Sequence, residues 1–284
     1  MKKVVYPIFA VIVFIIMQAV AGVALVAVGA LRNIDKAKAI AASGDSDAMM
    51  KELASPDMLA LAIVVSGILT IIVIALLKMI DWKQVLNVKT INWSWGAASI
   101  VAAFAGIFAL DIAEEMLDLP NLMEDTFTDM SNSVMGALGI GLLGPIIEEF
   151  IFREGIEGYM LRGGVNKWVA IVGSALAFGI IHLNPAQVPF AAAMGIILGV
   201  IYYKTGNIVI TSILHILNNS IAVWQMYTLG DAAKDFSLVE SVGGTTHAVI
   251  LMMVGAAVCV TMLISFWRKY RQNSTFGSYR FARI

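Results

Sequence analysis

Residues 144 to 157 read GPIIEEFIFREGIE, and the rest of the chain is best understood from this stretch. Two adjacent carboxylates, Glu148 and Glu149, end an apolar run that begins at Val134, and Arg153 follows them among further apolar residues. A charge near the middle of a membrane span costs roughly 2.5 to 3.5 kcal/mol on insertion scales. Two acids in such a place predict either a tightly paired polar group or a functional site.

Helical geometry gives the two acids different partners. Residues four apart share one face of an α-helix, so Glu149, Arg153 and Glu157 are expected to form a ladder of acid, base and acid. Glu148 lies about 100° round the helix from Glu149 and has no neutralising partner nearby in the sequence. We therefore interpret Glu149 and Arg153 as a structural pair and Glu148 as the candidate for chemistry.

The composition is that of a polytopic membrane protein. Of 284 residues, 60% are hydrophobic and 14% are charged, whereas a soluble domain has about 25% charged residues. The formal net charge of -1 argues against nucleic acid as a partner. The single cysteine, Cys259, rules out an intramolecular disulfide and a cysteine metal cluster in this sequence.

Runs of about 20 mainly apolar residues predict an all-α, polytopic transmembrane bundle of about eight helices. No internal repeat accompanies them. The fifth and sixth runs are short and are joined by the segment from Asn184 to Gln187, which predicts a tight helical hairpin. The predicted spans are 5–31, 58–80, 93–112, 133–160, 167–184, 187–203, 206–227 and 248–267.

Positive charges in the loops predict the orientation of these spans. With the N-terminus inside, thirteen Lys and Arg residues fall on the cytoplasmic side and five on the outer side, with Arg153 set aside. Cytoplasmic loops of membrane proteins carry an excess of positive charge. We therefore expect both termini in the cytoplasm. The membrane is expected, separately, to be the cytoplasmic membrane of a prokaryote. The acidic outer loop, residues 114–129, is interpreted as a solvated connector.

Further polar side chains fall inside later spans. His182 lies in the fifth predicted span and His215 in the seventh. Asn219 follows His215 by one helical turn, and Phe178 precedes His182 by one turn. Counting about 1.5 Å per residue from the cytoplasmic ends places Glu148, His182 and His215 roughly 15 to 22 Å deep. We expect these side chains to meet in one layer of the bundle.

Two kinds of chemistry fit a glutamate, two histidines and an amide in a pocket of low dielectric constant. Glu148 can take a proton from water while His and Asn donors stabilise the oxyanion formed as that water attacks a carbonyl carbon, which is peptide hydrolysis. The alternative is a Zn2+ site built from Glu148, His182 and His215, with an open position for water. Sequence spacing does not choose between the two.

The order of these motifs resembles a known family. It is similar to the type II CAAX prenyl endopeptidases and the bacteriocin-processing or self-immunity proteins, also called the CPBP or Abi family. The resemblance covers about residues 133–227, on successive apolar spans. The matching motifs are E-E-x-x-x-R (Glu148, Glu149, Arg153), F-x-x-x-H (Phe178, His182) and H-x-x-x-N (His215, Asn219).

The resemblance implies an eight-helix intramembrane endopeptidase in which Glu148 activates water. It implies that His182 positions this water, that His215 and Asn219 form the oxyanion site, and that Glu149, Arg153 and Phe178 support them. The substrate would be a membrane-embedded or membrane-anchored peptide, which in eukaryotic members is prenylated. Members often carry glycine directly after the arginine, where this chain has Glu154, and this departure predicts an altered cytoplasmic mouth of the cavity.

The resemblance also divides the chain into three parts. Residues 1–132 would supply helices one to three, residues 133–227 the catalytic core with spans four, five and seven, and residues 228–284 the last helix and a basic cytoplasmic tail. Two other functions stay open, namely a non-catalytic immunity or scaffold protein and a proton-coupled transporter. A transporter favours repeats or paired broken helices, which this sequence lacks, and a scaffold has no chemical need for Glu148.

Overall fold

The computed structural model describes residues 2–44, 53, 55–83, 85–91, 93–233 and 236–269. Every secondary-structure element in these ranges is helical, and seven helices are long and apolar enough to cross a bilayer. The predicted all-α polytopic bundle is confirmed. Lys51, Lys234 and the basic tail from residue 270 onward, which the orientation prediction used, lie outside the described residues.

The elements are α1 (Lys2–Arg32), α2 (Ile34–Ser43), α4 (Pro56–Leu76), η1 (Val88–Thr90), α5 (Trp93–Leu117), α6 (Glu124–Ser131), α7 (Val134–Leu138), η2 (Gly139–Leu143), α8 (Gly144–Glu148), η3 (Glu149–Gly158), α9 (Tyr159–Arg162), α10 (Lys167–Ile180), α11 (Gln187–Thr205), α12 (Ile208–Leu229), η4 (Gly230–Ala233), α13 (Leu238–Ser241) and α14 (Thr245–Lys269).

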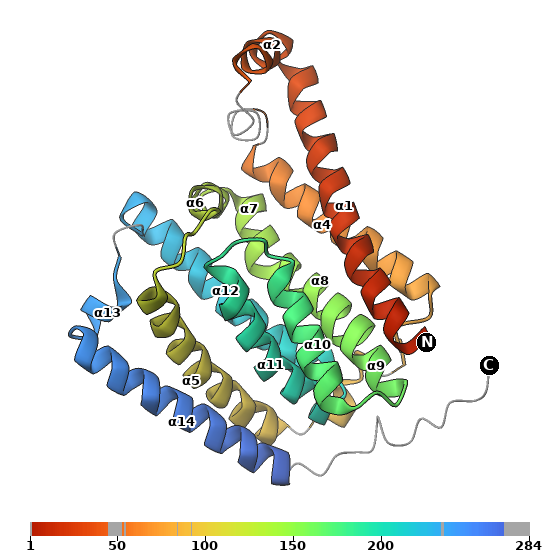
Figure 1. Cartoon of the computed structure of the whole chain (residues 1–284), viewed down its shortest axis with the longest axis vertical. Helices are drawn as coiled ribbons and strands as arrows, with labels where there is room; N and C mark the ends of the chain where they lie inside the picture. Colours follow the sequence, from red (N-terminus) through yellow and green to blue (C-terminus); the bar gives the residue numbers. More distant parts are fainter. Residues whose placement is uncertain are drawn as a thin grey trace.

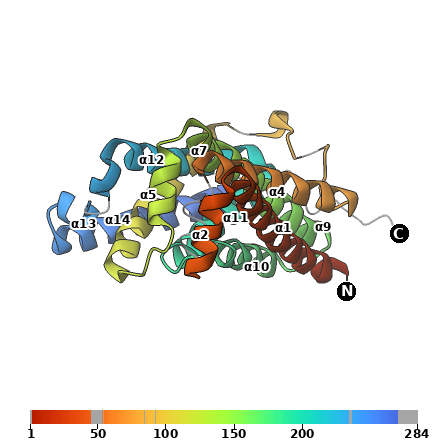
Figure 2. The ribbon, with the colours of Figure 1, turned by 90° about the horizontal axis from the view of Figure 1, so that it is seen from above.

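The bundle has an antiparallel helix pair at each edge. α1 packs against α4 at one edge, and α5 packs against α14 at the other, with the remaining long helices between these pairs (Figure 1). Seen from above, α13 and α9 lie at opposite sides of the molecule (Figure 2). The continuous helix from α7 to α9 contacts α1, α4, α10, α11 and α12. The acid-bearing stretch therefore lies inside the bundle.

The fifth predicted span is shorter than the sequence indicated. α10 has 14 residues and ends at Ile180, so it reaches only about 21 Å at 1.5 Å per residue, against a hydrocarbon core of roughly 30 Å. His182 therefore lies in the turn after the helix, and the next residue, Leu183, has φ 51°. The left-handed backbone of Leu183 and the restriction that Pro185 places on Asn184 keep the chain from resuming the helix. The side-chain Oδ1 of Asn184 accepts a hydrogen bond from the Leu122 amide at 3.0 Å.

α10 and α11 form the predicted helical hairpin and pack at very short range. Gly179 on α10 faces α11, and a Cβ there would lie 2.6 Å from the carbonyl oxygen of Val188 and 2.8 Å from the Cβ of Ala192. No side chain fits between the two backbones at this point. The glycine thus determines how closely α11 approaches α10, and with it the position of the neighbouring Phe178.

Gly179→Ala is expected to destabilise the protein by about 1 to 3 kcal/mol, because the added methyl group forces the two helices apart. Gly173→Ala on the same helix is the matched control, since the nearest atom to a Cβ there is the Cε of Met160 at 4.0 Å. Replacing that helical glycine is expected to be neutral or to stabilise by up to about 1 kcal/mol. Unfolding in detergent, followed by circular dichroism, compares the two. Equal stability of both variants would contradict the tight contact.

Several helix ends predicted to be cytoplasmic meet at one end of the bundle. A Cβ on Gly163 would lie 3.1 Å from the Cγ of Lys3, so α1 begins beside the end of α9. Lys204 donates a hydrogen bond of 2.7 Å to the carbonyl of Trp267, and the Lys167 ammonium lies 4.6 Å from the centre of the Trp267 ring. Lysine and tryptophan are typical of helix ends at a bilayer surface. Which side this end faces stays a prediction.

Candidate active site

The acid-bearing helix changes its winding between the two glutamates. α8 ends at Glu148, and the π-helical segment η3 begins at Glu149. π-Helical turns are rare and frequently occur at functional sites. The side chain of Glu149 is fully buried, whereas that of Glu148 is 19% exposed. Of the two neighbouring acids, Glu148 is therefore the one that a small molecule such as water can reach.

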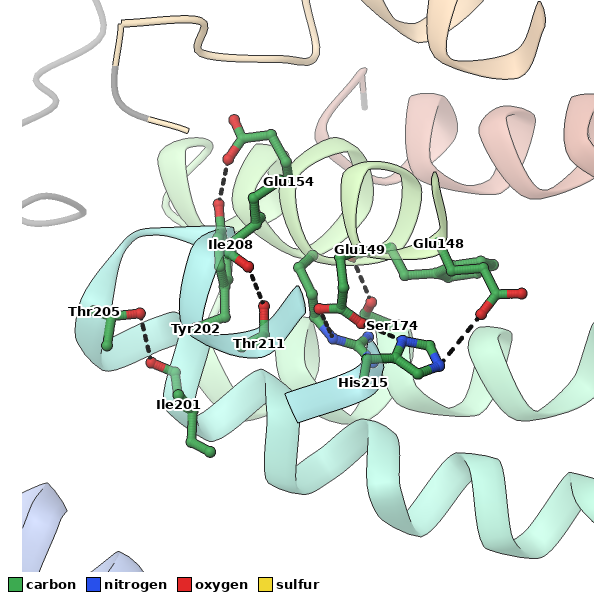
Figure 3. Close-up of polar contacts among 12 residues, drawn as sticks. Glu148, Glu149, Glu154, Ser174, Ile201, Tyr202, Thr205, Ile208, Thr211 and His215 are labelled. Atoms are coloured by element: carbon green, nitrogen blue, oxygen red, sulfur yellow. Dashed lines mark hydrogen bonds and ion pairs between the residues drawn. The ribbon is translucent and has the colours of Figure 1, made fainter. Parts of the chain in front are cut away.

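His215 on α12 lies between the two carboxylates (Figure 3). Its Nδ1 is 3.1 Å from Oε1 of Glu149, and its Nε2 is 3.5 Å from Oε2 of Glu148. An ionised carboxylate can only accept a hydrogen bond, so we assign the hydrogen on Nδ1 to the contact with Glu149. Nε2 is thereby left facing Glu148, as an acceptor in the neutral ring and as a donor in the imidazolium. Glu148 has no partner in its own helix, and His215 supplies one from α12. His215 also contacts Glu149, from which it is separated by 66 residues in the sequence.

Arg153 is the counter-ion of Glu149. Its Nε lies 3.3 Å from Oε2 of Glu149, and both side chains are fully buried, so this part of the predicted ladder is confirmed. The guanidinium carbon also lies 5.0 Å from the centre of the Phe178 ring, a distance at which a cation and an aromatic face attract each other. Arg153 thus compensates the negative charge of Glu149, and its contact with Phe178 connects η3 with α10.

The third member of the predicted ladder forms no hydrogen bond with Arg153. Glu157 is fully buried, but within the described part of the chain neither of its carboxylate oxygens has a hydrogen-bond partner. Its Oε2 lies against α11, where a Cβ on Gly199 would be 2.8 Å away. Both pairs are four residues apart within η3, so the packing of Glu157 against α11, rather than the winding, distinguishes it from Glu149.

The aromatic ring of Phe178 contacts both histidines that the sequence predicted for the site. Phe178 is 1% exposed, and its ring stands edge-on to His182 and His215, with centroid distances of 5.0 Å and 5.5 Å. Nδ1 of His182 lies 2.8 Å from the carbonyl oxygen of Phe178. Because a carbonyl oxygen only accepts, Nδ1 is assigned as the donor, and Nε2 of neutral His182 is left as an acceptor.

Asn219 lies one turn beyond His215, and part of its amide is bound to backbone. Its Nδ2 donates to the carbonyl oxygen of Ile140 at 3.0 Å, and its Oδ1 accepts from Nδ2 of Asn218 at 3.1 Å. An amide nitrogen has two hydrogens, so one remains for another acceptor. Asn218 and Asn219 were predicted to lie on different faces of the helix. The hydrogen bond between their side-chain amides nevertheless joins them.

Glu154 belongs to a separate polar network that the sequence did not indicate. It was predicted to alter the mouth of the cavity, but its side chain is 1% exposed and points toward Tyr202, away from His215 (Figure 3). Its carboxylate lies 2.7 Å from Nη1 of Arg162 and accepts from the Tyr202 hydroxyl at 2.5 Å and from the Asp81 amide at 2.8 Å. Tyr202 and Asp81 lie outside this helix, so spacing along the helix does not reveal these contacts, and the effect of Glu154 on the cavity mouth stays a prediction.

The zinc site considered from the sequence finds no support in this geometry. Among the described residues, no group of three His, Cys, Asp or Glu side chains could hold a metal ion. Nδ1 of His182 faces the carbonyl of Phe178 and Nδ1 of His215 faces Glu149, so Nε2 is the nitrogen that each ring leaves for another partner.

Comparison with known proteins finds similarity in the part of the chain that contains this site. Residues 130–221 match the model of the family described as type II CAAX prenyl endopeptidase Rce1-like. The membrane-embedded CAAX protease MroQ of Staphylococcus aureus is 29% identical over 89 residues, which are 30% of this chain and 36% of MroQ. YdiL of Bacillus subtilis, a putative membrane peptidase by name, is 32% identical over 82 residues, which are 29% of this chain and 33% of YdiL.

The chain thus spans about a third of the length of these curated relatives. No solved structure matches it. The site extends in sequence from Glu148 to His215. This range lies within the matched region. The protein is an integral membrane protein with apolar spanning helices, and its residues 130–221 resemble the type II CAAX prenyl endopeptidases, as the order of its motifs predicted.

Proposed function

We propose that the protein is an intramembrane endopeptidase that hydrolyses a peptide bond of a membrane-associated substrate. The observation that carries this proposal is the position of His215 between the accessible Glu148 and the buried Glu149, at 3.5 Å and 3.1 Å. The match of residues 130–221 to a peptidase family supports it.

Glu148 acts as the general base. As an ionised carboxylate, it accepts one proton from a water molecule, whose oxygen attacks the carbonyl carbon of the scissile peptide bond. His182 orients this water, because its Nδ1 hydrogen is directed to the Phe178 carbonyl and its Nε2 is left as an acceptor. The attack forms a tetrahedral oxyanion and protonated Glu148.

His215 stabilises the oxyanion. It donates from Nε2 in the imidazolium form of the ring, in which both ring nitrogens carry a hydrogen. Glu149 holds the ring through Nδ1, and Arg153 keeps the charge of Glu149 compensated. The second amide hydrogen of Asn219 is proposed as a further donor. Preorganised donors of this kind are worth about 100- to 1,000-fold in rate.

Collapse of the tetrahedral intermediate completes the reaction. The carbon–nitrogen bond breaks, protonated Glu148 gives its proton to the leaving amine, and the products are a new carboxyl terminus and a new amino terminus. Glu148 returns to the carboxylate form. Each turnover therefore consumes one water molecule and requires neither an oxidant nor another co-reactant.

The remaining parts of the chain are assigned around this core. Residues 133–227 are proposed as the catalytic core, residues 1–132 as accompanying helices, and residues 228–284 as the last helix with a basic tail. We propose both termini on the cytoplasmic side of a prokaryotic membrane. The substrate class suggested by the relatives is a membrane-anchored, CAAX-like or otherwise lipidated peptide.

The test is to follow water into the product. Membranes that contain the wild-type protein, or its Glu148→Gln variant at equal abundance, are incubated in water enriched in 18O, and new peptide carboxyl termini are identified by mass spectrometry. Hydrolysis predicts labelled termini that only the wild type produces. Identical sets of termini from both membranes would reject the endopeptidase and favour the non-catalytic scaffold.

A further inference from the structure

Pro145 interrupts the backbone hydrogen bonds of the acid-bearing helix just before the two glutamates. Because proline has no N–H, it cannot donate to the carbonyl four residues earlier, Gly141, or to the one five residues earlier, Ile140. Both carbonyls lie in the π-helical segment η2, where the Gly144 amide already donates to the carbonyl of Gly139. The proline removes the donor of one of these two carbonyls, and the change from i to i−5 bonding in η2 to i to i−4 bonding in α8 passes over the other.

Consecutive side chains of α12 donate to these two carbonyls. Nδ2 of Asn219 donates to Ile140 at 3.0 Å, and the Ser220 hydroxyl donates to Gly141 at 3.2 Å. Inside a bilayer no bulk water is present to satisfy a freed carbonyl, so a neighbouring helix commonly supplies the donor. The match of two adjacent acceptors with two adjacent donors joins α12 to the helix of the glutamates at one level.

This junction, which we call the proline clamp (Ile140, Gly141 and Pro145 with Asn219 and Ser220), lies about one helical turn from the site on both helices. Glu148 follows Pro145 by three residues, and His215 precedes Asn219 by four. A slide or rotation of α12 along the other helix would change the clamp and the 3.5 Å contact between Glu148 and His215 together.

We propose that Ser220 is a positioning residue that holds His215 opposite Glu148 by donating to the carbonyl left unpaired by Pro145. Asn219 shares this task through one of its amide hydrogens, while the other stays free for the oxyanion. The catalytic part of this proposal rests on the proposed endopeptidase function. The clamp itself does not, because it is a junction between two helices whatever the protein does.

A double-mutant cycle tests the clamp, using the Ser220→Ala and Pro145→Ala variants singly and together. Pro145→Ala restores one backbone N–H, which in α-helical winding pairs with the carbonyl of Gly141, the acceptor of Ser220. We expect Ser220→Ala alone to lower kcat for a peptide identified in the 18O experiment by about tenfold, with KM within about twofold, as for one lost hydrogen bond of roughly 1.4 kcal/mol. In the Pro145→Ala background the same change is expected to cost less than about twofold.

Two further variants separate positioning from general damage. Ser220→Thr keeps the hydroxyl and is expected to retain kcat. Thr228→Ala is the matched control, because the Thr228 hydroxyl bonds to carbonyls of its own helix, those of Trp224 and Gln225. It is expected to leave kcat unchanged. Equal kcat losses for Ser220→Ala with and without Pro145, or no loss in either background, would overturn the proposal.

The unfolding of the four proteins of the cycle in detergent distinguishes failure of the clamp from failure of the proposed function. If the clamp exists, Ser220→Ala lowers the unfolding midpoint of the wild-type protein more than that of the Pro145→Ala variant, even for a protein that cleaves nothing. Additive shifts would reject the clamp. A coupled shift without any cleavage by the wild type would keep the clamp and reject the endopeptidase.

Discussion

Replacing Glu148 with glutamine is expected to lower the rate of peptide hydrolysis by roughly 100- to 10,000-fold, the range typical of a lost general base. Glutamine keeps the size and one oxygen of the side chain but cannot accept the proton of the attacking water at neutral pH. Because the Glu148 side chain is 19% exposed and its contact with His215 is 3.5 Å long, the folded state should lose little. The measurement is the rate of appearance of 18O-labelled product by reconstituted protein, alongside its unfolding midpoint.

Glu240→Gln is the matched control for this result. Glu240 is an exposed carboxylate on α13, and its substitution removes one negative charge far from η3 in the sequence. The control should cleave at the wild-type rate. A Glu148→Gln protein that cleaves within about threefold of wild type would show that another group takes the proton, since even a weak general base contributes about 100-fold.

Arg153→Ala is expected to destabilise the protein by about 3 to 5 kcal/mol, the usual cost of removing one partner of a buried ion pair. Arg153, Glu149 and Glu157 are all fully buried. Without the guanidinium, two acidic side chains would stay in the interior with no cation on their own helix segment, and the face of Phe178 would lose its cation. Reversible unfolding in detergent or in SDS-containing mixed micelles provides the free energy.

Arg32→Ala provides the comparison for this large loss. Arg32 is an exposed arginine at the end of α1, and its Nη1 contacts the sulfur of Met58 at 3.4 Å. Its removal should change the free energy of unfolding by no more than about 0.5 kcal/mol. If Arg153→Ala were as stable as Arg32→Ala but inactive, Arg153 would be acting in the reaction, and its assignment as the structural partner of Glu149 would be wrong.

These two expectations together separate the roles of adjacent acids. Substitution at Glu148 should affect rate much more than stability, whereas substitution at Arg153, which compensates Glu149, should affect stability at least as much as rate. The physical reason is burial, because a charged group with no access to solvent must be compensated in every molecule, whether or not substrate is bound.

Local features of the chain were readable from the sequence. Long apolar runs identified a helix in each of the eight predicted spans, because hydrophobic length is a property of consecutive residues. The pair of Glu149 and Arg153 followed from their spacing on one helix, and its 3.3 Å distance agrees. The resemblance to a peptidase family also followed from short motifs and their order.

Tertiary structure decided what depends on the winding and the packing of separate helices. Packing of η3 against α11 placed Glu157 beside Gly199, without a hydrogen-bond partner among the described residues, and placed Glu154 in the network of Tyr202 and Arg162. The early end of α10 put His182 in a turn, although the apolar run continued beyond it.

The sequence by itself determined which residues are apolar, charged or four apart. The contact of His215 with Glu148 and Glu149, by contrast, arose only when α12 packed against α8 and η3. Spacing along one helix sets local pairs, but contacts between helices depend on how closely and at what level their backbones approach.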